Sequence, residues 1–368
     1  MRVVLVTEFY YPHLGGVTEH VHHLALELRR RGHHVTILTS HMRGEGADPP
    51  FVRRLGTSRV IYSNGAFARI TTGWRLTGRI ETLLREVDAD LVHVQDGLAP
   101  VLGPLAANAA ARLGLPVVAT FHSWFPRSIG YHVFRGPFQR RLDRLAARIA
   151  VSEPVVSALS RYFTGHWEVI PNGVDVNLFH PNGRGPTDYL ARGPRLLFLG
   201  RLDPRNGLDT VLSAMPRILE RFPATRLVIA GDGPLRPVYE RAARLLGDAV
   251  DFVGRVNGER PDYYGTTDLY LCPTTKASFG ITLLEAMACA TPLVVSDIIG
   301  FRELVAGGAE AVLVPPREPR AWADAVVRLI ADPVRREAMG QAGRTKAANF
   351  AWPRVSDRVL AVYRRVLG

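Results

Sequence analysis

Short apolar runs alternate with segments of helical spacing along the whole chain. Residues 2–7 are an almost continuous apolar run, and the apolar positions of residues 17–31 then recur every three or four residues until Gly32. Such continuous runs predict strands buried on both faces, and the wider spacing predicts helices between them. The pattern predicts further strands at 34–39, 90–94, 116–120, 149–151, 168–170, 195–199, 226–230, 250–253, 269–272, 293–295 and 311–314. Helices are expected at 98–113, 138–147, 154–163, 208–222, 235–246, 281–289, 320–331, 333–348 and 353–367.

The alternation is interrupted between residues 176 and 194, where Pro, Gly and Asn are frequent and apolar periodicity is weak. We therefore expect a linker at 176–194 between two α/β domains, at 1–175 and 195–350. Each domain is predicted to be a Rossmann-like, doubly wound parallel sheet. Because such sheets bind ligands at the carboxyl ends of their strands, a cleft between the two facing domains is the expected site.

Composition favours a globular enzyme, since 47% of the 368 residues are apolar and 22% are charged. Cys272 and Cys289 both lie in apolar runs, so a disulfide framework is not expected and a reducing cytoplasm fits the chain. The N-terminal apolar run is too short for a signal peptide, and no run approaches the roughly 20 residues of a membrane span.

The formal charge of +12 favours anionic partners such as nucleotide phosphates or an anionic membrane surface. A nucleic acid is not expected, because the chain has no nucleic-acid-binding motif. Residues 69–85 combine four arginines with Trp74 and several aliphatic residues. That pattern fits an interfacial helix at the inner face of the cell membrane, and it fits equally a surface helix packed on its own domain.

Several loops that follow predicted strands could carry chemistry. Gly15-Gly16 would begin the first helix with free N–H groups, which suit a phosphate, although a plain tight turn has the same pattern. His122 follows the strand at 116–120 and is expected to point into the cleft. Gly200-Arg201 follows the strand at 195–199, and the Arg201 guanidinium matches diphosphate oxygens. The glycines of the next loop, Gly231-Asp232-Gly233, would let another backbone come close, but the dinucleotide fingerprint is incomplete.

The segment 276–297, KASFGITLLEAMACATPLVVSD, predicts a small-residue turn, a short apolar helix and a buried strand. A helix N-terminus after such a turn favours a phosphate. Glu285 lies within the apolar helix, where a carboxylate needs donors such as ribose hydroxyls. The segment therefore fits a nucleoside diphosphate site, and it fits equally a buried helix–strand corner with a satisfied carboxylate.

The motifs EFYYPHLGGV, ATFHS, VIPNGVD, FLGRLD, GDGP, SFGITLLEAMA and TPLVVSD follow one another over essentially the whole chain. Together they resemble the GT-B retaining glycosyltransferases of family 4. Within this family, GGVTEH, YSNGAFAR at 62–69 and FAWPRV resemble the phosphatidyl-myo-inositol mannosyltransferase branch. The resemblance implies that the C-terminal helix, 351–368, returns to the first domain.

The resemblance also implies roles for individual residues. His122 would contact the donor sugar, Arg201 would hold the diphosphate, and Glu285 would hold the ribose. Gly15 and Gly16 would approach the acceptor, and Gly16 the donor phosphate as well. The remaining implied contacts with the donor are made by Ser278, Phe279, Gly280 and Ile281, and those with an inositol phosphate by Asn64 and Arg69.

Three positions depart from the family pattern. Asn206 stands where a Lys is usual, Ala277 where a sugar-binding Glu is usual, and Ala290 where a Gly is usual. Arg205 or Lys276 could replace the missing positive charge at the phosphate. The alternative to an active enzyme is therefore a catalytically weakened, nucleotide-sugar-binding paralogue.

The expected reaction is a retaining, metal-independent transfer of a hexose such as mannose from a GDP- or UDP-sugar to a lipid or glycan hydroxyl. No cofactor is expected besides this co-substrate, because arginine and helix N–H groups can neutralise the diphosphate. We identify no cluster of His, Asp and Glu residues at metal-ligand spacing.

Overall fold

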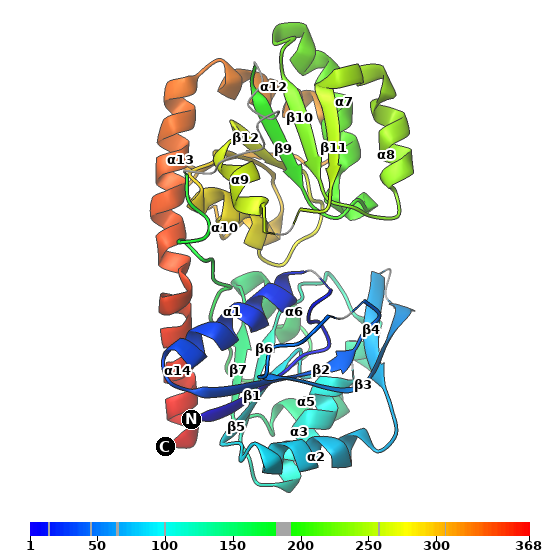
Figure 1. Cartoon of the computed structure of the whole chain (residues 1–368), viewed down its shortest axis with the longest axis vertical. Helices are drawn as coiled ribbons and strands as arrows, with labels where there is room; N and C mark the ends of the chain where they lie inside the picture. Colours follow the sequence, from blue (N-terminus) through cyan, green and yellow to red (C-terminus); the bar gives the residue numbers. More distant parts are fainter. Residues whose placement is uncertain are drawn as a thin grey trace. The chain divides into compact units, whose positions relative to one another are not determined.

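The computed structural model describes residues 1–13, 15–44, 46–63, 66–98, 101–181, 193–256, 258–305 and 307–368. The chain forms two compact units, each built on a twisted sheet (Figure 1). The first comprises Met1–Gly173 and Trp352–Gly368, and the second comprises Val174–Ala351. Of the expected linker, residues 182–192 lie outside the described residues, so its extent stays a prediction.

The sheet of the first unit has the strand order β4-β3-β2-β1-β5-β6-β7-β8. Its strands are β1 Arg2–Val6, β2 His34–His41, β3 Val52–Ser63, β4 Ala66–Thr72, β5 Leu91–Gln95, β6 Val117–Phe121, β7 Ala147–Ala150 and β8 Glu168–Val169. All neighbouring strands are parallel except β3 and β4, which pair antiparallel at one edge. The central strands β5 and β6 are fully buried, as their continuous apolar runs predicted.

Helices cover both faces of this sheet: α1 Gly16–Arg30, α2 Leu76–Glu86, α3 Leu102–Arg112, α4 Ile129–Val133, α5 Arg135–Leu142, α6 Glu153–Ser160 and α14 Trp352–Leu367. Val3 and Leu5 point to the face on which α1 and the C-terminal α14 pack together. Helix α3 packs on the opposite face, where it contacts β1, β5 and β6. The last helix of the chain therefore belongs to the core of the first unit.

The sequence pattern was wrong for the segment 69–85, which is not one helix. Strand β4 ends at Thr72 and α2 begins only at Leu76. The β3–β4 hairpin was not predicted, because an edge strand alternates polar and apolar residues instead of forming a continuous apolar run. The expected helix at 138–147 is also too long, since α5 ends at Leu142 and β7 begins at Ala147.

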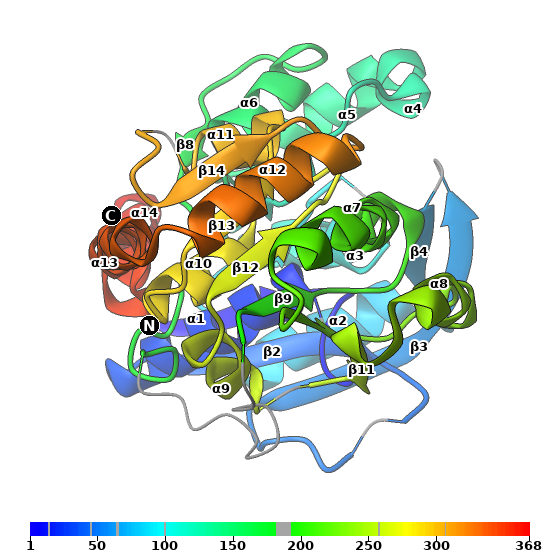
Figure 2. The same ribbon diagram turned by 90° about the horizontal axis from the view of Figure 1, so that it is seen from above.

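The sheet of the second unit has the order β11-β10-β9-β12-β13-β14, and all its pairs are parallel (Figure 2). Its strands are β9 Arg195–Leu199, β10 Arg226–Ala230, β11 Val250–Gly254, β12 Leu269–Cys272, β13 Leu293–Ser296 and β14 Ala311–Val314. The predicted strands of this unit are confirmed to within one residue at each end. The apolar pattern succeeds here because every strand is covered on both faces.

Helices of the second unit are α7 Leu208–Arg221, α8 Arg236–Ala243, α9 Arg260–Gly265, α10 Ile281–Ala288, α11 Ile299–Arg302, α12 Pro319–Ile330 and α13 Pro333–Ala347. The short helices α9 and α11 were not predicted, because a four- to six-residue helix has too few turns to show periodicity. The helix expected at 235–246 ends at Ala243 and continues as a 3-10 helix, Arg244–Ala249, that contains the non-helical Gly247.

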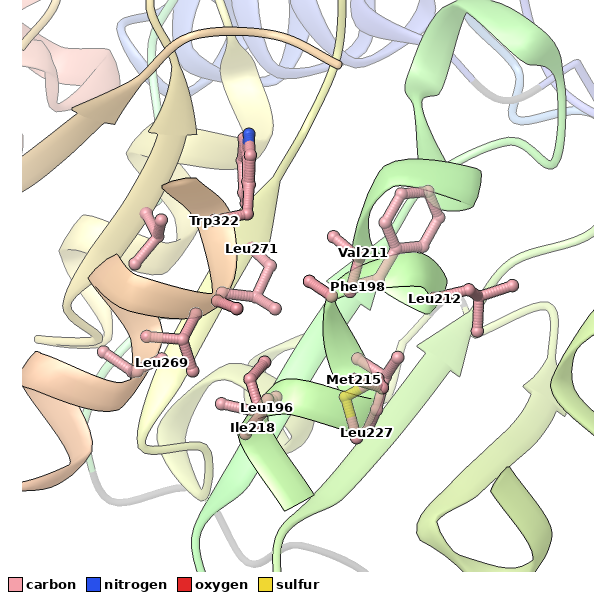
Figure 3. Packing of buried hydrophobic residues seen from close by; sticks show 14 of the residues in the cluster. Leu196, Phe198, Val211, Leu212, Met215, Ile218, Leu227, Leu269, Leu271 and Trp322 are labelled. Atoms are coloured by element: carbon pink, nitrogen blue, oxygen red, sulfur yellow. The ribbon is translucent and has the colours of Figure 1, made fainter. Parts of the chain in front are cut away.

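The core of the second unit lies between β9, β10 and β12 on one side and α7 and α12 on the other (Figure 3). Leu196, Phe198 and Leu271 point from the strands toward Met215 of α7 and Trp322 of α12. Each fully buried side chain of this size contributes about 1.5–3 kcal/mol to folding. Because successive strand residues point to opposite faces, Tyr270 points away from this core and contacts Tyr264 of α9.

Within the described residues, no helix combines the length and the apolar character that a membrane crossing requires.

Candidate functional site

The N-terminus of α1 carries the glycine pair expected to approach ligands. Gly15 precedes the helix, Gly16 is its first residue, and both are exposed. No described side chain caps this helix N-terminus, so its first N–H groups suit an anionic ligand. Thr18 donates instead to the carbonyl oxygen of His13, at 2.8 Å, which fixes the preceding loop.

His122 follows β6 directly and is held from two sides by the end of β5. Its backbone N–H donates to Asp96 Oδ1 at 3.0 Å, and its Nε2 lies 2.7 Å from Gln95 Oε1. Burial holds the pKa of His122 well below its ordinary value, so the ring is neutral at pH 7. Because the Gln95 oxygen is an acceptor, Nε2 carries the ring proton and Nδ1 keeps its lone pair. The sequence analysis did not predict a role for Gln95. In the sequence, this residue is distinguished only by its position at the end of a strand.

Two further histidines lie on the same side of the sheet as His122. The His20 ring of α1 lies 4.9 Å from the His122 ring, and His93 of β5 bonds Tyr363 Oη at 2.6 Å and Thr120 Oγ1 at 2.7 Å. Burial lowers the pKa of His20 to about 4 and that of His93 to about 3. Neutral imidazoles thus line the layer between the sheet and the helices α1 and α14.

The pKa of Asp96 is shifted in the opposite direction. Burial raises its pKa to about 6, although the hydrogen bond from the His122 backbone acts in the other direction. The residue has a positive φ of 56°, which is uncommon for a side-chain-bearing residue and typical of functional turns.

Glu8, which follows β1, joins three elements of the first unit. It accepts hydrogen bonds from the backbone N–H groups of Val101 and Leu102 at the start of α3, at 2.9 and 2.6 Å. Its other carboxylate oxygen accepts from the Thr71 hydroxyl of β4. The negative charge therefore stabilises a helix N-terminus and connects the β3–β4 hairpin to the carboxyl end of β1.

Arg69 lies in β4, two residues before Thr71 and hence on the same face of that strand. Its guanidinium donates to Ser58 Oγ of β3 at 3.3 Å. The structure thus places Arg69 on a strand tied to the carboxyl end of β1. Asn64, the other residue expected to bind an inositol phosphate, lies outside the described residues.

In the second unit, the loop after β9 presents Arg201 with about half of its side chain exposed. Its Nε lies 3.8 Å from Asp203 Oδ2. Asn206 closes this loop, because its amide donates to the Arg201 carbonyl oxygen at 2.7 Å and its side-chain oxygen accepts from Thr274 at 3.4 Å. The residue that replaces the usual Lys therefore has a structural role in the loop.

The glycines after β9 and β10 pack the two loops against each other. Gly231 has φ 144°, and a Cβ there would overlap the carbonyl oxygen of Gly200. A Cβ at Gly233 would likewise overlap the carbonyl oxygen of Leu202. The expected close approach of another backbone is confirmed.

The two cations considered as replacements for Lys lie in hydrogen-bonded loops. Thr275 donates its backbone N–H to the Arg205 carbonyl oxygen at 2.8 Å, and Lys276 is the next residue. Both Arg205 and Lys276 are exposed. Because β9 and β12 are paired, these loops and Arg201 share the carboxyl edge of the sheet.

The turn before α10 has the conformation that its small residues predicted. Gly280 is left-handed, with φ 108°, and precedes Ile281, the first residue of the helix. Phe279 is buried and its ring lies 6.2 Å from that of Phe350, whereas Ser278 is partly exposed. A Cβ at Gly300 would overlap the Ala277 carbonyl oxygen, so α11 packs directly on this turn.

Glu285 is almost completely buried in α10 and has protein partners. Its Oε1 accepts from the Arg260 guanidinium at 2.8 Å, and its Oε2 accepts from the Tyr264 hydroxyl at 3.2 Å. The Phe179 ring packs over Arg260, with 5.6 Å between its centroid and the guanidinium carbon. The satisfied carboxylate of the simpler interpretation is therefore present, and ribose binding by Glu285 stays a prediction.

The expected residues fall into two groups, with His122, Gly15, Gly16 and Arg69 in the first unit and Arg201, Arg205, Lys276 and Glu285 in the second.

The described ranges contain no group of three or more His, Cys, Asp or Glu side chains that could hold a metal ion.

Family models match both units. The model described as "Glycosyltransferase Family 4" matches residues 14–178, and that described as "Glycosyl transferases group 1" matches residues 193–332.

Named relatives match over nearly the whole chain. A phosphatidyl-myo-inositol mannosyltransferase of Mycobacterium tuberculosis (strain ATCC 25618 / H37Rv) is 33% identical over 375 residues, which cover 100% of this chain and 98% of the relative. A D-inositol 3-phosphate glycosyltransferase of Streptosporangium roseum is 28% identical and covers 95% of this chain and 88% of its own.

Solved structures show the same fold. The sucrose-phosphate synthase of Thermosynechococcus elongatus has a TM-score of 0.77 at 22% identity, and covers 99% of this chain and 98% of its own. The Anabaena protein HepE, in complex with UDP-glucose, has a TM-score of 0.76 at 20% identity, and covers 99% of this chain and 100% of its own. Both units thus have the α/β architecture of GT-B glycosyltransferases.

Proposed function

Because the chain belongs to the glycosyltransferase family that includes the phosphatidyl-myo-inositol mannosyltransferases, we propose that it transfers mannose to an inositol phospholipid. The donor is a nucleoside diphosphate hexose, with GDP-mannose as the first choice. The observation that carries this proposal is the 33% identity to a phosphatidyl-myo-inositol mannosyltransferase over the full length of the chain. The reaction is assigned to the cytoplasmic face of the membrane, where a peripheral protein meets a lipid acceptor.

The second unit supports donor binding through charge and backbone geometry. Arg201, Arg205 and Lys276 follow neighbouring strands, and the N-terminus of α10 lies beyond Gly280. Guanidinium and ammonium groups bind phosphate oxygens, and helix N–H groups add an oriented dipole. This edge is therefore the proposed diphosphate site, with Ser278, Phe279 and Ile281 beside it and Glu285 directed to the ribose.

We propose transfer with retention of the anomeric configuration. The bond between the sugar C1 and the diphosphate oxygen breaks, and the acceptor oxygen bonds C1 on the same face. The acceptor proton passes to the departing phosphate oxygen. Arg201 stabilises the charge that develops on the diphosphate, a kind of contact worth about 3–4 kcal/mol in a transition state. No bound metal is required, because the cations and helix N–H groups supply the positive charge.

His122 suits a positioning contact with the donor sugar. The ring is neutral and buried, and Gln95 directs its protonated nitrogen toward the protein interior. The unprotonated Nδ1 is then left as an acceptor for a sugar hydroxyl. Gly16, at the start of α1, offers N–H groups to the phosphate of donor or acceptor.

A donor and acceptor panel tests the proposal. Purified protein is incubated with GDP-mannose, UDP-glucose or UDP-N-acetylglucosamine, together with phosphatidylinositol or inositol phosphate, and with chelator in half of the samples. The expected result is GDP release coupled to an α-mannosylated phosphatidylinositol, at a rate unchanged by chelator. An inverted product, or a rate abolished by chelator and restored by Mn²⁺, contradicts the corresponding part of the proposal.

The same panel of donors and acceptors distinguishes transfer of the sugar from binding of the nucleotide sugar alone. Calorimetric binding of a nucleotide sugar with neither release nor transfer would favour a catalytically weakened paralogue. The double substitution Asn206→Lys and Ala277→Glu then shows whether these positions limit turnover.

A further inference from the structure

His20, on α1, lies between two other rings of the first unit. Its ring meets that of His122 edge-to-face, with 4.9 Å between the centroids and 75° between the planes. It meets the indole of Trp352 in the same way, at 5.6 Å and 66°. Helices α1 and α14 pack side by side (Figure 1). The two ring contacts therefore connect both helices to the end of β6, which His122 follows.

The hydrogen bonds of His122 do not by themselves fix the plane of its ring. Gln95 holds Nε2 at the far end of the ring, and Asp96 holds the backbone N–H. The ring plane can still rotate about the bond from Cβ, a torsion whose preferences are broad in histidine. A second ring packed edge-to-face opposes that rotation, because such pairs favour a defined angle between the planes. The direction of Nδ1 thus depends on His20.

The ring contacts of His20 are not supplemented by hydrogen bonds within the described residues. The side chain is 1% exposed, and neither ring nitrogen has a hydrogen-bond partner in that part of the chain. Asn172 lies beside the ring, and its influence on the pKa of His20 opposes that of burial, but its Oδ1 also lacks a partner there. Buried polar atoms without a partner cost stability. Replacing His20 with an apolar residue of similar size therefore removes a ring contact without breaking a hydrogen bond.

Trp352 is held at the point where the chain returns to the first unit. The chain leaves this unit after Gly173 and re-enters it at Trp352, the first residue of α14. The His23 ring stacks on the indole, at 5.7 Å and 12°. A Cβ at Gly173 would come within 2.6 Å of the indole, so the backbone of the departing chain packs directly on that ring. The position of the indole is thus set by both crossings of the chain.

We propose that His20 is a positioning residue for His122 and that it relates the orientation of the His122 ring to the position of Trp352. A displacement of the chain at either crossing moves the indole, and the two edge-to-face contacts pass that movement to His122. Burial keeps the His122 ring neutral, and His20 and His93 lower its pKa further, so the ring that His20 orients keeps a lone pair on Nδ1. The consequence for sugar transfer rests on the proposed function, in which His122 contacts the donor sugar, but the ring contact itself does not.

Nuclear magnetic resonance tests the contact without any assay of transfer. The full chain is prepared with labelled histidine and tryptophan in a deuterated background, and the His122 signals are assigned by their loss in His122→Asn. In wild type we expect nuclear Overhauser effects from the ring protons of His20 to those of both His122 and Trp352. The nitrogen shifts of His122 at pH 7 report which of its nitrogens carries the proton. Absence of the effect between His20 and His122 overturns the proposal, and this measurement needs no variant at position 20.

Two variants at position 20 separate the ring contact from the filling of space. His20→Phe keeps a ring that can meet His122 edge-to-face, whereas His20→Leu keeps a similar volume and removes the ring. The matched control is His22→Leu, the same change two residues further along α1, where the histidine bonds Tyr10 Oη at 2.9 Å. Thermal melting reports on folding of each variant. Calorimetric binding of GDP, which lacks the sugar that His122 is proposed to contact, reports on the second unit.

His20→Leu is expected to shift the His122 ring signals and to lower kcat about 3–10-fold, the worth of one aromatic pair, with the melting temperature and GDP binding unchanged. His20→Phe is expected to keep kcat within about twofold of wild type. The control breaks a hydrogen bond, so it is expected to melt at a lower temperature while the His122 signals and kcat stay as in wild type. A purely structural role of His20 would instead lower the melting temperature of His20→Leu and leave the His122 signals unchanged.

Trp352→Leu in the His20→Leu background is expected to add no further shift of the His122 signals, because its effect passes through His20. An added shift would overturn the part assigned to Trp352. Unchanged His122 signals in folded His20→Leu, or equal shifts in His20→Leu and His20→Phe, overturn the positioning role, and an unchanged kcat with shifted signals overturns its importance for transfer. If wild type transfers no sugar from any donor, the proposed function fails while the resonance measurements still decide the ring contact.

Discussion

Glu285 shows how much of a residue's chemistry depends on neighbours that are distant in sequence. Its place in an apolar helix predicted a need for donors, and Arg260 and Tyr264 of α9 supply two of them. These contacts fix the carboxylate in one orientation before any ligand arrives. The proposed recognition of two neighbouring ribose hydroxyls would use such a fixed acceptor.

Glu285→Gln is expected to weaken binding of GDP by about 10–100-fold, because hydrogen bonds to a charged group contribute about 1.5–3 kcal/mol. Binding of 2′,3′-dideoxy-GDP, which lacks both hydroxyls, is expected to change little. Calorimetry with both nucleotides measures the difference. Glu240→Gln, which removes a surface pair with Arg236, is the control. An equal loss for the two nucleotides would show that Glu285 acts only through stability.

Gln95 is the residue that orients His122, and its removal is expected to affect turnover more than donor binding. Gln95→Met keeps the volume but removes the hydrogen bond, which is worth about 0.5–1.5 kcal/mol. We expect kcat to fall about 3–10-fold, with the KM for the donor nearly unchanged. Gln95→Glu keeps an acceptor for Nε2 and is expected to restore part of the rate. Gln341→Met, on the exposed side of α13, is the control, and a change confined to KM would argue against the assignment.

At the scale of elements, the chain's apolar periodicity predicted those strands and helices that are buried on one or both faces. It failed at the β3–β4 hairpin, where one face meets solvent, and at α9 and α11, which are too short for a period to appear. It also did not predict α4, whose aliphatic residues are exposed, whereas the aliphatic face of α2 is buried. That distinction depends on what packs against each helix and not on the helix itself.

The layer between the first sheet and α1 predicts a pH dependence of stability. His20, His93 and His122 have pKa values lowered from 6.5 in the fold, so the unfolded chain binds more protons at pH 5 and stability falls with pH. Asp96 acts oppositely, because its raised pKa of about 6 lets the folded state bind a proton there. The histidines together bind more protons on unfolding than Asp96 releases, so the free energy of unfolding is expected to fall as the pH drops below 6, by about 1.4 kcal/mol per pH unit for each net proton.

Urea unfolding at constant ionic strength between pH 7 and pH 5 measures this slope. His93→Gln is expected to reduce it by about 1.4 kcal/mol per pH unit, whatever its effect on stability at pH 7. His34→Gln, which replaces an exposed histidine, is the control variant. A slope that is equal in His93→Gln and wild type would contradict the assignment.

At the scale of the whole molecule, the first unit is assembled from both ends of the chain. Val355, Val359 and Leu360 of α14 are buried in the core that Val3 and Leu5 begin. His93 and Tyr363, which are 270 residues apart, share a hydrogen bond in that core. The first unit is therefore complete only when α14 has been made.

Leu360→Ala is expected to destabilise the first unit by about 2–5 kcal/mol, the usual cost of a cavity left by a buried leucine. Hydrogen exchange followed by mass spectrometry should show faster exchange in β1, β5 and α1, with β9 and β10 unaffected. Leu367→Ala, at the exposed end of the same helix, is the control. Faster exchange throughout the second unit would mean that the two units do not unfold separately.

The sequence by itself determined the alternation of strands and helices, the loops that follow the strands, and the glycosyltransferase family. Local apolar spacing is sufficient for the elements, and short motifs at strand ends are sufficient for the family. The tertiary structure decided what those residues do: Arg260 fixes Glu285, Gln95 fixes His122, Asn206 closes the Arg201 loop, and α4 is left exposed where α2 is buried. The contacts of Glu285 and of His122 join segments that are 25 and 27 residues apart in sequence. Only folding determines which polar group finds such a partner and which apolar face is covered.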